Sequence, residues 1–391
     1  MPSILTRQPF KALYTLLATT FESIRLPLYV VLYILPSTRP HPKWTYKQAI
    51  LTKLFKTFLH HAAKVEIRVP LSLNPGKEGE RFAIIRAPDI STQEKLYIGP
   101  MRDPHGEIAP EAVGGTWYPS AYPRSNTHIR DTETVVLHFH GGAYVVGSGR
   151  DDDCGFLAST FIRHAGVNRV FCPQYRLSGP PVNGRFPAAL QDALTSYLYL
   201  IRDLGIPAKQ IIVSGDSAGG NLVIALLRYL AEYGSEIGLE GQSPGAAWLW
   251  SPWVNPGAAI DPKAIETNPK YPTDYLPGSF GAWGIRCFAG HDEASGRQKV
   301  DAGDNYISPL GKPFKTDVPI WVQTGEAEVL CMEDCKFAEE MRKENDGHVG
   351  LWVEEGAVHD IALIGPRAGF GEEAEACARR AGEWLAENRR S

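Results

Sequence analysis

A serine lies in the segment GDSAGG at residues 215–220, which fits the pattern G-x-S-x-G. The apolar run before it, residues 210–215, is typical of a buried strand, and the run at 218–233 has helical spacing. A sharp turn from a strand into a helix holds a serine hydroxyl clear of the backbone, and the flanking glycines leave room for that turn. We therefore predict that Ser217 is a nucleophile, next to helix amides that favour a developing oxyanion.

A second glycine-rich segment, HFHGGAY at residues 138–144, also follows an apolar run. Two glycines after a strand can turn their backbone N–H groups toward a common point. An acyl-transfer enzyme needs such donors for the negative charge of its tetrahedral intermediate. We predict that the N–H groups of Gly141, Gly142 and Ala218 form this oxyanion hole. His140 is predicted to brace the loop rather than to transfer protons.

These segments occur together with YRL at 175–177 and FPAALQDALTSYLYLI at 186–201. With this combination the chain resembles the hormone-sensitive-lipase-like group of α/β-hydrolase esterases over residues 134–359, whereas residues 1–64 lie outside the resemblance. The resemblance implies a mostly parallel sheet of about eight strands with a helical cap. It also implies hydrolysis of carboxylic esters through an acyl-serine intermediate, without a cofactor. Ala143 departs from the family, which more often has glycine at that position.

A serine nucleophile needs a base that is itself oriented by a carboxylate, and in α/β-hydrolases the chain order is serine, acid, histidine. His359 follows the last predicted strand and is the predicted base. The resemblance assigns the acid to Glu328, where the family usually has aspartate. A glutamate can orient the imidazole if its loop retracts by one methylene. Glu326, Glu333 and Asp334 remain alternatives, because spacing cannot exclude a small shift within a loop.

The elements that must position these residues are visible as alternating strand and helix patterns. Six apolar runs are typical of strands buried on both faces, at residues 134–140, 168–175, 210–215, 245–252, 318–325 and 349–356. Helical patterns occur at residues 186–204, 218–233, 331–344 and 372–388. This alternation predicts an α/β fold, with a mostly parallel sheet and helices on both faces.

The sheet pattern is interrupted over residues 254–307, and an insertion of this length is typical of a lid or cap. We expect a catalytic domain over residues 65–391 that contains this insertion. An N-terminal helical segment, residues 1–64, is expected to complete the cap. Antiparallel edge strands are predicted where short extended segments are separated by turn residues, at 65–70, 81–88 and 95–100.

The N-terminal segment has the strongest apolar excess in the chain. Residues 10–35 are mostly apolar, but their longest uncharged run, 26–38, is shorter than the about 20 residues of a membrane span. Three interpretations stay open for this stretch: a helix packed on the protein, a helix lying in a membrane interface, and a bent membrane anchor. Residues 44–63 predict an amphipathic helix with a basic face, which covers an apolar groove or faces lipid headgroups.

Composition excludes several other classes of protein. The 391 residues include 44 acidic and 40 basic ones, a net charge of −4 that does not favour a nucleic-acid partner. Six cysteines without a CxxC pair predict no disulfide framework and an intracellular location, cytoplasmic or on the face of an internal membrane. Cys331 and Cys335 lack further ligands nearby, as do the aspartates at 151–153, so no metal site is predicted. Asp216 is predicted to serve hydrogen bonding in the serine turn.

The leading hypothesis is a serine carboxylesterase acting on a lipophilic or natural-product-like small-molecule ester. The alternatives are an acyltransferase or lyase that uses the same residues, and a non-catalytic receptor. The receptor is disfavoured because Ser217, His359 and an acid are all present. Aromatic residues predicted to line the substrate pocket are Tyr144, Trp253, Tyr275 and Trp283, with Tyr271 and Phe280 beside them. The oligomeric state is left open.

Overall fold

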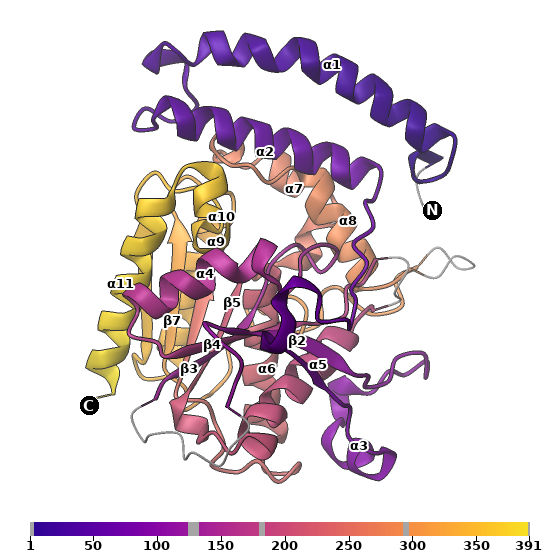
Figure 1. Ribbon diagram of the computed structural model, residues 1–391, viewed down its shortest axis with the longest axis vertical. Helices are drawn as coiled ribbons and strands as arrows, with labels where there is room; N and C mark the ends of the chain where they lie inside the picture. The colour runs from indigo at the N-terminus through magenta and orange to yellow at the C-terminus, as the bar shows by residue number, and fades with distance from the viewer. Residues whose placement is uncertain (1–3, 124–132, 180–183, 292–296, 390–391) are drawn as a thin grey trace.

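The computed structural model describes residues 4–123, 133–179, 184–291 and 297–389 (Figure 1). Its centre is an eight-stranded sheet with the strand order β1-β2-β4-β3-β5-β6-β7-β8. β2 runs antiparallel to both β1 and β4, and all other neighbours are parallel. The strands are β1 (Phe82–Ile85), β2 (Val113–Tyr118), β3 (Val135–Phe139), β4 (Arg169–Gln174), β5 (Ile211–Asp216), β6 (Ala246–Trp250), β7 (Ile320–Gly325) and β8 (Val349–Glu354).

The predicted mostly parallel sheet is confirmed, because each of the six apolar runs coincides with one of the strands β3 to β8 to within a few residues. Every residue of β3, β5, β6 and β7 is buried, as expected for strands covered on both faces. Parallel strands of one sheet point the same way. The loops that follow β3, β5, β7 and β8 therefore meet at its carboxyl edge, where ligands bind in open α/β sheets.

The antiparallel edge differs from the prediction. Residues 82–85 form β1, but residues 65–70 contain no strand. Residues 95–100 hold the end of helix α3 (Ile90–Leu96) and the start of a 3₁₀ turn. Local extended patterns are weak evidence for a strand at a sheet edge, because pairing there depends on partners far away in the chain.

The strand next to this edge, β2, was not predicted, because its two glycines weaken the apolar pattern of a strand. Glycine is required at both positions because aromatic rings of the neighbouring strands occupy the space of a side chain. A β-carbon on Gly114 would lie 2.4 Å from the ring of Phe82, and one on Gly115 would lie 2.3 Å from the ring of Phe171. The glycines of β2 therefore make room for large side chains of β1 and β4.

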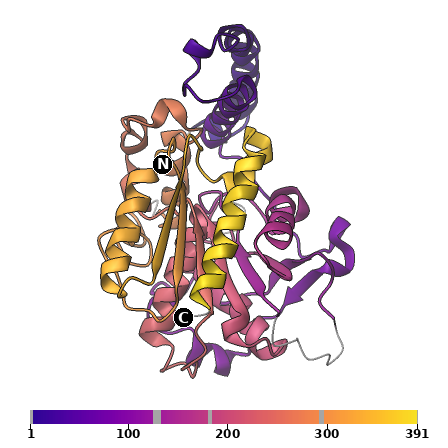
Figure 2. The same ribbon diagram turned by 90° about the vertical axis from the view of Figure 1, so that its left-hand side faces the viewer.

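Helices cover both faces of the sheet, and Figure 2 shows α9 and α11 on opposite sides of it. The predicted helices are confirmed as α5 (Ala188–Leu198), α6 (Ala218–Tyr233), α9 (Cys331–Glu344) and α11 (Gly371–Asn388). Two further helices, α4 (Asp151–His164) and α10 (Ile361–Ala368), were not predicted. The three aspartates at 151–153 form the first turn of α4, where acidic side chains complement the helix dipole.

Four helices lie over the carboxyl edge of the sheet, and we call them the cap (Figure 1). They are α1 (Phe10–Leu32), α2 (Tyr46–Lys64), α7 (Lys263–Glu266) and α8 (Gly278–Phe288). α2 begins with a capping box, in which Thr45 and Gln48 satisfy each other's backbone N–H groups. α2 packs on α8 and α10, whereas α1 lies across α2 on its outer side (Figure 1). The division into residues 1–64 and 65–391 stays a prediction.

A buried ion pair joins the end of β4 to α5. The guanidinium of Arg176 contacts the Asp192 carboxylate with its Nε at 3.0 Å and its Nη2 at 2.8 Å, and the backbone N–H of Arg176 donates to the same carboxylate at 2.7 Å. Both side chains are largely buried. Removing one member of a buried pair leaves the other charge without its partner, which costs more than the pair contributes.

Asp192→Ala should therefore destabilise the fold by about 3–5 kcal/mol, because the buried Arg176 guanidinium keeps only the mostly exposed Glu111 carboxylate, 3.4 Å away, as a counter-charge. Urea unfolding followed by circular dichroism measures the change. Glu339→Ala is the matched control, since it removes an exposed pair with Lys343 on α9 and should leave the midpoint nearly unchanged. Equal midpoints for the two variants would contradict this assignment.

Candidate active site

Ser217 is the single residue between β5 and α6. Its backbone has φ 50° and ψ −115°, a conformation that residues other than glycine rarely adopt. The surrounding backbone holds it there, because its N–H donates to the Trp250 carbonyl at 2.9 Å and its carbonyl accepts from the Trp253 N–H at 2.9 Å. The turn leaves the Ser217 side chain on the wall of a cavity at the carboxyl edge of the sheet.

The glycines around Ser217 are required by close backbone contacts. A β-carbon on Gly215 would lie 2.2 Å from the carbonyl oxygen of Gly219. A β-carbon on Gly219 would lie 1.9 Å from the carbonyl oxygen of Phe139, at the end of β3. Both distances are far below van der Waals contact. The G-x-S-x-G spacing therefore lets α6 start directly against β3 and β5.

His359 lies in the loop after β8 and lines the same cavity as Ser217. Its Nδ1 is 3.7 Å from Oε1 of Glu328, which lies in the loop after β7. The separation is longer than a hydrogen bond, and catalytic hydrogen bonds are often long in a site without substrate. Both residues are buried. The three predicted residues thus come from the ends of three parallel strands, in the order serine, acid, histidine.

The Glu328 carboxylate is held by neighbours on its other side. Its Oε2 accepts from the Ser251 hydroxyl at 2.7 Å and from the Gly325 N–H at 3.1 Å. Burial alone would raise the pKa of Glu328, but His359 and the hydrogen bond from Ser251 lower it below the usual value. Glu328 is therefore a carboxylate at neutral pH.

The three alternative acids have other contacts. Glu326 pairs with Lys270, and Glu333 accepts from the Asn255 amide at 2.8 Å. Asp334 is buried, and its burial together with the nearby Glu328 charge raises its pKa well above the usual value. Its Oδ2 lies 2.8 Å from the Thr324 hydroxyl, which is also 2.8 Å from Glu328. A protonated Asp334 can donate to that hydroxyl, which then donates to Glu328.

A residue of the cap insertion, Asp274, also reaches this site and was not predicted. Its carboxylate accepts from the backbone N–H of Val329 at 2.9 Å and of His359 at 3.3 Å. It thereby joins the loops that carry the acid and the base. Lys56 of α2 donates in turn to the backbone carbonyl of Asp274 at 3.0 Å. Local sequence holds no signal for this contact, because Asp274 is 55 and 85 residues away from its partners.

Three buried carboxyl groups act on the charge of His359. Burial alone would lower the pKa of this imidazole, but Glu328, Asp274 and Asp216 outweigh burial and raise it. For Asp360, next in the chain, burial and the Asp216 carboxylate raise the pKa well above the usual value. The arrangement favours an imidazolium, which is the form a base takes after accepting a proton.

The predicted oxyanion loop lies between β3 and α4. Gly141 and Gly142 line the cavity together with Ser217, and Gly142 has φ +106°, which suits glycine. A β-carbon on Gly141 would lie 2.2 Å from Oδ2 of Asp216. Among the hydrogen bonds of the described residues, none uses the N–H of Gly141, Gly142 or Ala218 as donor. These amides are thus available to a ligand oxygen.

Two buried histidines, His138 and His140, make contacts that hold the oxyanion loop and the serine turn in place. His138 Nε2 lies 3.0 Å from Asp216 Oδ1, so Asp216 takes part in a buried pair beneath the serine turn. His140 stacks on Tyr175 with ring centroids 4.3 Å apart, and its Nδ1 lies 2.7 Å from the Gly141 carbonyl. Burial lowers the pKa of His140, which keeps it neutral. Both histidines thus have supporting contacts within the fold.

The cavity beside Ser217 has a volume of about 300 Å³ and mostly apolar walls. α2 supplies a large part of the wall, which the sequence indicated only as the apolar face of a helix. Of the aromatic residues singled out in the sequence, Tyr275 and Phe280 line this cavity. Tyr144 lies outside its wall, stacked on Phe288 with ring centroids 3.7 Å apart. The lining from α2, α8 and the segment before α8 consists of Phe55, Phe58, Leu59, Ala62, Tyr275, Leu276 and Phe280.

The remaining predicted pocket residues lie elsewhere. Trp253 and Trp283 are buried and are not among the described residues that line the cavity. Tyr271 faces a different hollow, between α1 and α2. The rings of Trp253 and Trp283 are part of the buried packing instead, which is a common use of large rings.

Known proteins with similar sequences have the same kind of fold. A family described as having the alpha/beta hydrolase fold matches residues 136–363, more than half of the chain. An acetyl-hydrolase of Streptomyces hygroscopicus is 33% identical over 208 residues, which cover 51% of this chain and 59% of that protein. Human hormone-sensitive lipase is 30% identical over 119 residues, 30% of this chain and 10% of that enzyme.

The overall fold also has a solved counterpart. The crystal structure of an esterase from the bacterial hormone-sensitive lipase family superposes with a TM-score of 0.55 and 23% identity, over 93% of this chain and 97% of that one. The matched region spans the strands and loops that carry Ser217, Glu328 and His359. The chain therefore belongs to the α/β-hydrolase family, in its hormone-sensitive-lipase-like group of esterases.

Proposed function

We propose that the chain is a serine carboxylesterase that hydrolyses small-molecule esters of lipophilic alcohols. The observation that carries this proposal is the convergence of Ser217, His359 and two oxyanion-loop glycines on one mostly apolar cavity, with Glu328 behind the histidine. A relative named as an acetyl-hydrolase favours a small acyl group. The apolar cap wall favours a lipophilic alcohol part.

In the proposed reaction the Ser217 oxygen attacks the ester carbonyl while His359 takes the hydroxyl proton. The N–H groups of Gly141, Gly142 and Ala218 donate to the oxyanion. His359 then protonates the leaving alcohol, and the acyl group stays on Ser217. Water attacks the acyl-enzyme by the same steps and releases the carboxylic acid. Glu328 keeps the imidazole oriented and stabilises its charge in each half of the cycle.

Ser217→Ala should lower the kcat for p-nitrophenyl acetate by at least about 10⁴-fold, because no acyl-enzyme can form. Labelling by a fluorophosphonate should be lost as well. Ser235→Ala, at an exposed serine after α6, is the matched control and should retain both activity and labelling. Turnover by the Ser217→Ala protein at the wild-type rate would rule out the proposed nucleophile.

Glu328→Gln should lower kcat by about 10²- to 10⁴-fold, because the amide cannot stabilise the imidazolium as a carboxylate does. Glu326→Gln is the matched control from the same loop and should retain most activity, since Glu326 pairs with Lys270 instead. Both variants should unfold at similar temperatures if the loop is intact. A larger loss of kcat in the Glu326 variant would reassign the acid.

The pH dependence of kcat/KM should show an acid limb with a midpoint above 6.5, the usual pKa of histidine. His359 acts as a base only when neutral, and the surrounding carboxylates raise its pKa. Activity should therefore fall as the pH drops through that raised pKa. Initial rates with p-nitrophenyl acetate from pH 5 to 9 measure the midpoint. A midpoint at or below 6.5 would contradict the charge balance described for this site.

A further inference from the structure

α1 has an apolar face that the protein leaves uncovered. Its outward side chains repeat at helical spacing and are between 55% and 69% exposed. Contiguous apolar surface of this extent is rare on soluble monomers and marks an interaction site. By length and composition α1 is also apolar enough to cross a membrane. The residues of this outer face are Leu13, Leu16, Leu17, Phe21, Ile24, Leu28 and Val31.

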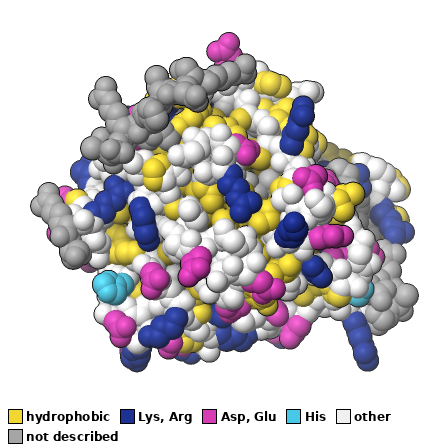
Figure 3. All heavy atoms as spheres, turned by 90° about the horizontal axis from the view of Figure 1, so that it is seen from below, with side chains coloured by type: hydrophobic (Ala, Val, Ile, Leu, Met, Phe, Trp, Pro, Cys, Tyr) yellow, Lys and Arg dark blue, Asp and Glu magenta, His cyan; other side chains and the backbone are white. Residues whose placement is uncertain are grey.

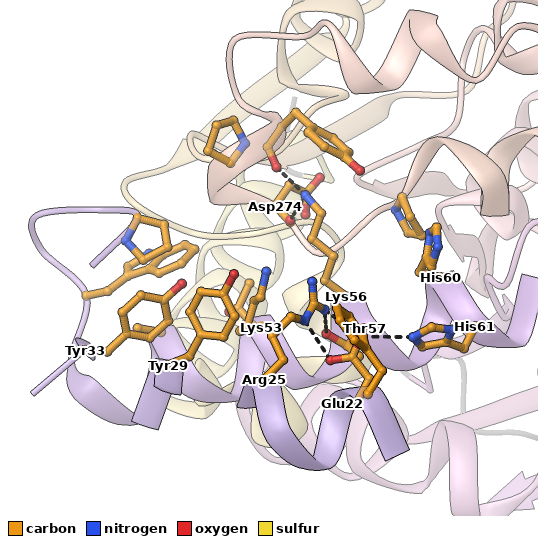
Figure 4. A pocket seen from close by; sticks show the side chains of 18 residues that line it. Glu22, Arg25, Tyr29, Tyr33, Lys53, Lys56, Thr57, His60, His61 and Asp274 are labelled. Atoms are coloured by element: carbon orange, nitrogen blue, oxygen red, sulfur yellow. Dashed lines mark hydrogen bonds and ion pairs between the residues drawn. The ribbon is translucent and has the colours of Figure 1, made fainter. Parts of the chain in front are cut away.

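The opposite face of α1 is polar and faces α2 (Figure 4). Glu22 accepts from Arg25 at 2.7 Å, and its Oε1 lies 3.1 Å from Nε2 of His61. Burial alone would raise the pKa of Glu22, but the hydrogen bonds from His61 and Arg25 lower it. The Lys53 ammonium lies 4.3 Å from the ring centre of Tyr29. The usual arrangement of a surface helix, apolar inward and polar outward, is therefore reversed.

These polar contacts run along the whole of α1. Near its start, Lys11 donates to the Val65 carbonyl at 3.1 Å. Near its end, the Tyr46 hydroxyl donates to the Val30 carbonyl at 2.9 Å. α1 therefore lies antiparallel to α2 over about 35 Å, the length of a 23-residue helix. A membrane-spanning position would break these contacts and expose Lys11, Glu22 and Arg25 to hydrocarbon, which is costly.

Charge on the same segment is strongly one-sided. Residues 1–64 contain a single carboxylate, Glu22, although acidic residues exceed basic ones in the whole chain. The end of the molecule opposite the cap, in contrast, shows both signs of charge interspersed with apolar side chains (Figure 3). A basic segment next to an apolar face complements an anionic lipid surface. The basic residues of the segment are Arg7, Lys11, Arg25, Arg39, Lys43, Lys47, Lys53, Lys56 and Lys64.

We propose that the outer face of α1 docks on the surface of an anionic lipid bilayer, with the helix lying in the plane of the interface. The outward leucines, isoleucine and phenylalanine enter the boundary between headgroups and acyl chains. The polar face keeps α1 attached to α2, and the exposed basic residues of the segment, Arg7, Lys47 and Lys64, supply positive charge for the headgroups. Of the three interpretations open from the sequence, this is the interfacial helix.

Docking in this position would bring the bilayer close to the catalytic cavity, a consequence that rests on the proposed function. A second hollow of about 660 Å³, distinct from the one that Tyr271 lines, lies between α1 and α2. Phe58, Ala62 and Ile67 line both this hollow and the cavity that holds Ser217. These shared side chains lie at a boundary between the two spaces. A lipophilic ester dissolved in the bilayer can therefore enter beside Phe58 without crossing bulk water.

The test measures flotation of the full chain with vesicles, in a Ser217→Ala background so that binding is recorded without turnover. Vesicles of phosphatidylcholine with phosphatidylserine should bind the protein, and vesicles of phosphatidylcholine alone should bind it less. Leu17→Gln together with Ile24→Gln should weaken binding by about tenfold or more, because both side chains leave the lipid contact. The matched control pairs Ile90→Gln with Met332→Gln, at exposed apolar positions of α3 and α9, and should bind as the parent does.

Absence of binding to the anionic vesicles, or equal binding by the two double variants, would overturn the proposal. A dimer in light scattering that Leu17→Gln with Ile24→Gln dissociates, without vesicle binding, would assign the face to a second copy and would also overturn it. Hydrolysis of p-nitrophenyl acetate without vesicles, by chains that keep Ser217, tests the esterase separately. There the α1 variant should match the wild type, so failure of docking and failure of catalysis are distinguishable.

Discussion

The site depends on one steric constraint, the contact between the start of α6 and the ends of β3 and β5. Ser217 can face the cavity only because the chain turns from strand to helix within a single residue of positive φ. That turn leaves no space for a side chain at Gly215 or Gly219. The same contact brings the oxyanion loop after β3 against the serine. Nucleophile and oxyanion donors are thus positioned by one piece of backbone packing.

Buried carboxyl groups set the charge of the site that the backbone positions. Five carboxyl groups are buried in and around the catalytic loops, and their ionisation differs with their neighbours. The pKa values of Glu328 and Asp216 are lowered, in both cases because a histidine contact outweighs burial. Burial raises the pKa values of Asp274, Asp334 and Asp360. The site therefore gathers carboxyl oxygens as hydrogen-bond acceptors while limiting the number of like charges in its interior.

Sequence patterns predicted the parts of the fold that local residues determine. The strand and helix around Ser217 and the parallel strands were predictable because each is a short apolar run between turns. β2 was not predictable, since Gly114 and Gly115 break its apolar pattern to make room for rings on neighbouring strands. The contact of Asp274 with two loops and the cavity wall from α2 depend on chain segments that meet only after folding. Aromatic content alone could not show that Tyr275 lines the cavity whereas Tyr144 is packed inside the protein.

The hydrogen bonds of Asp274 have a consequence for how the cap can move. Its carboxylate holds the backbone of both catalytic loops, and its own backbone is held by Lys56 of α2. If α2 and the segment that carries Asp274 moved away together, the hydrogen bonds from Val329 and His359 to Asp274 would break and the loop of His359 would lose its anchor. A movement wide enough to exchange large ligands would then also leave the catalytic base, His359, without its ordered position. If His359 is to stay in place while substrate enters, access must therefore depend on small side-chain movements and not on a rigid-body movement of the cap.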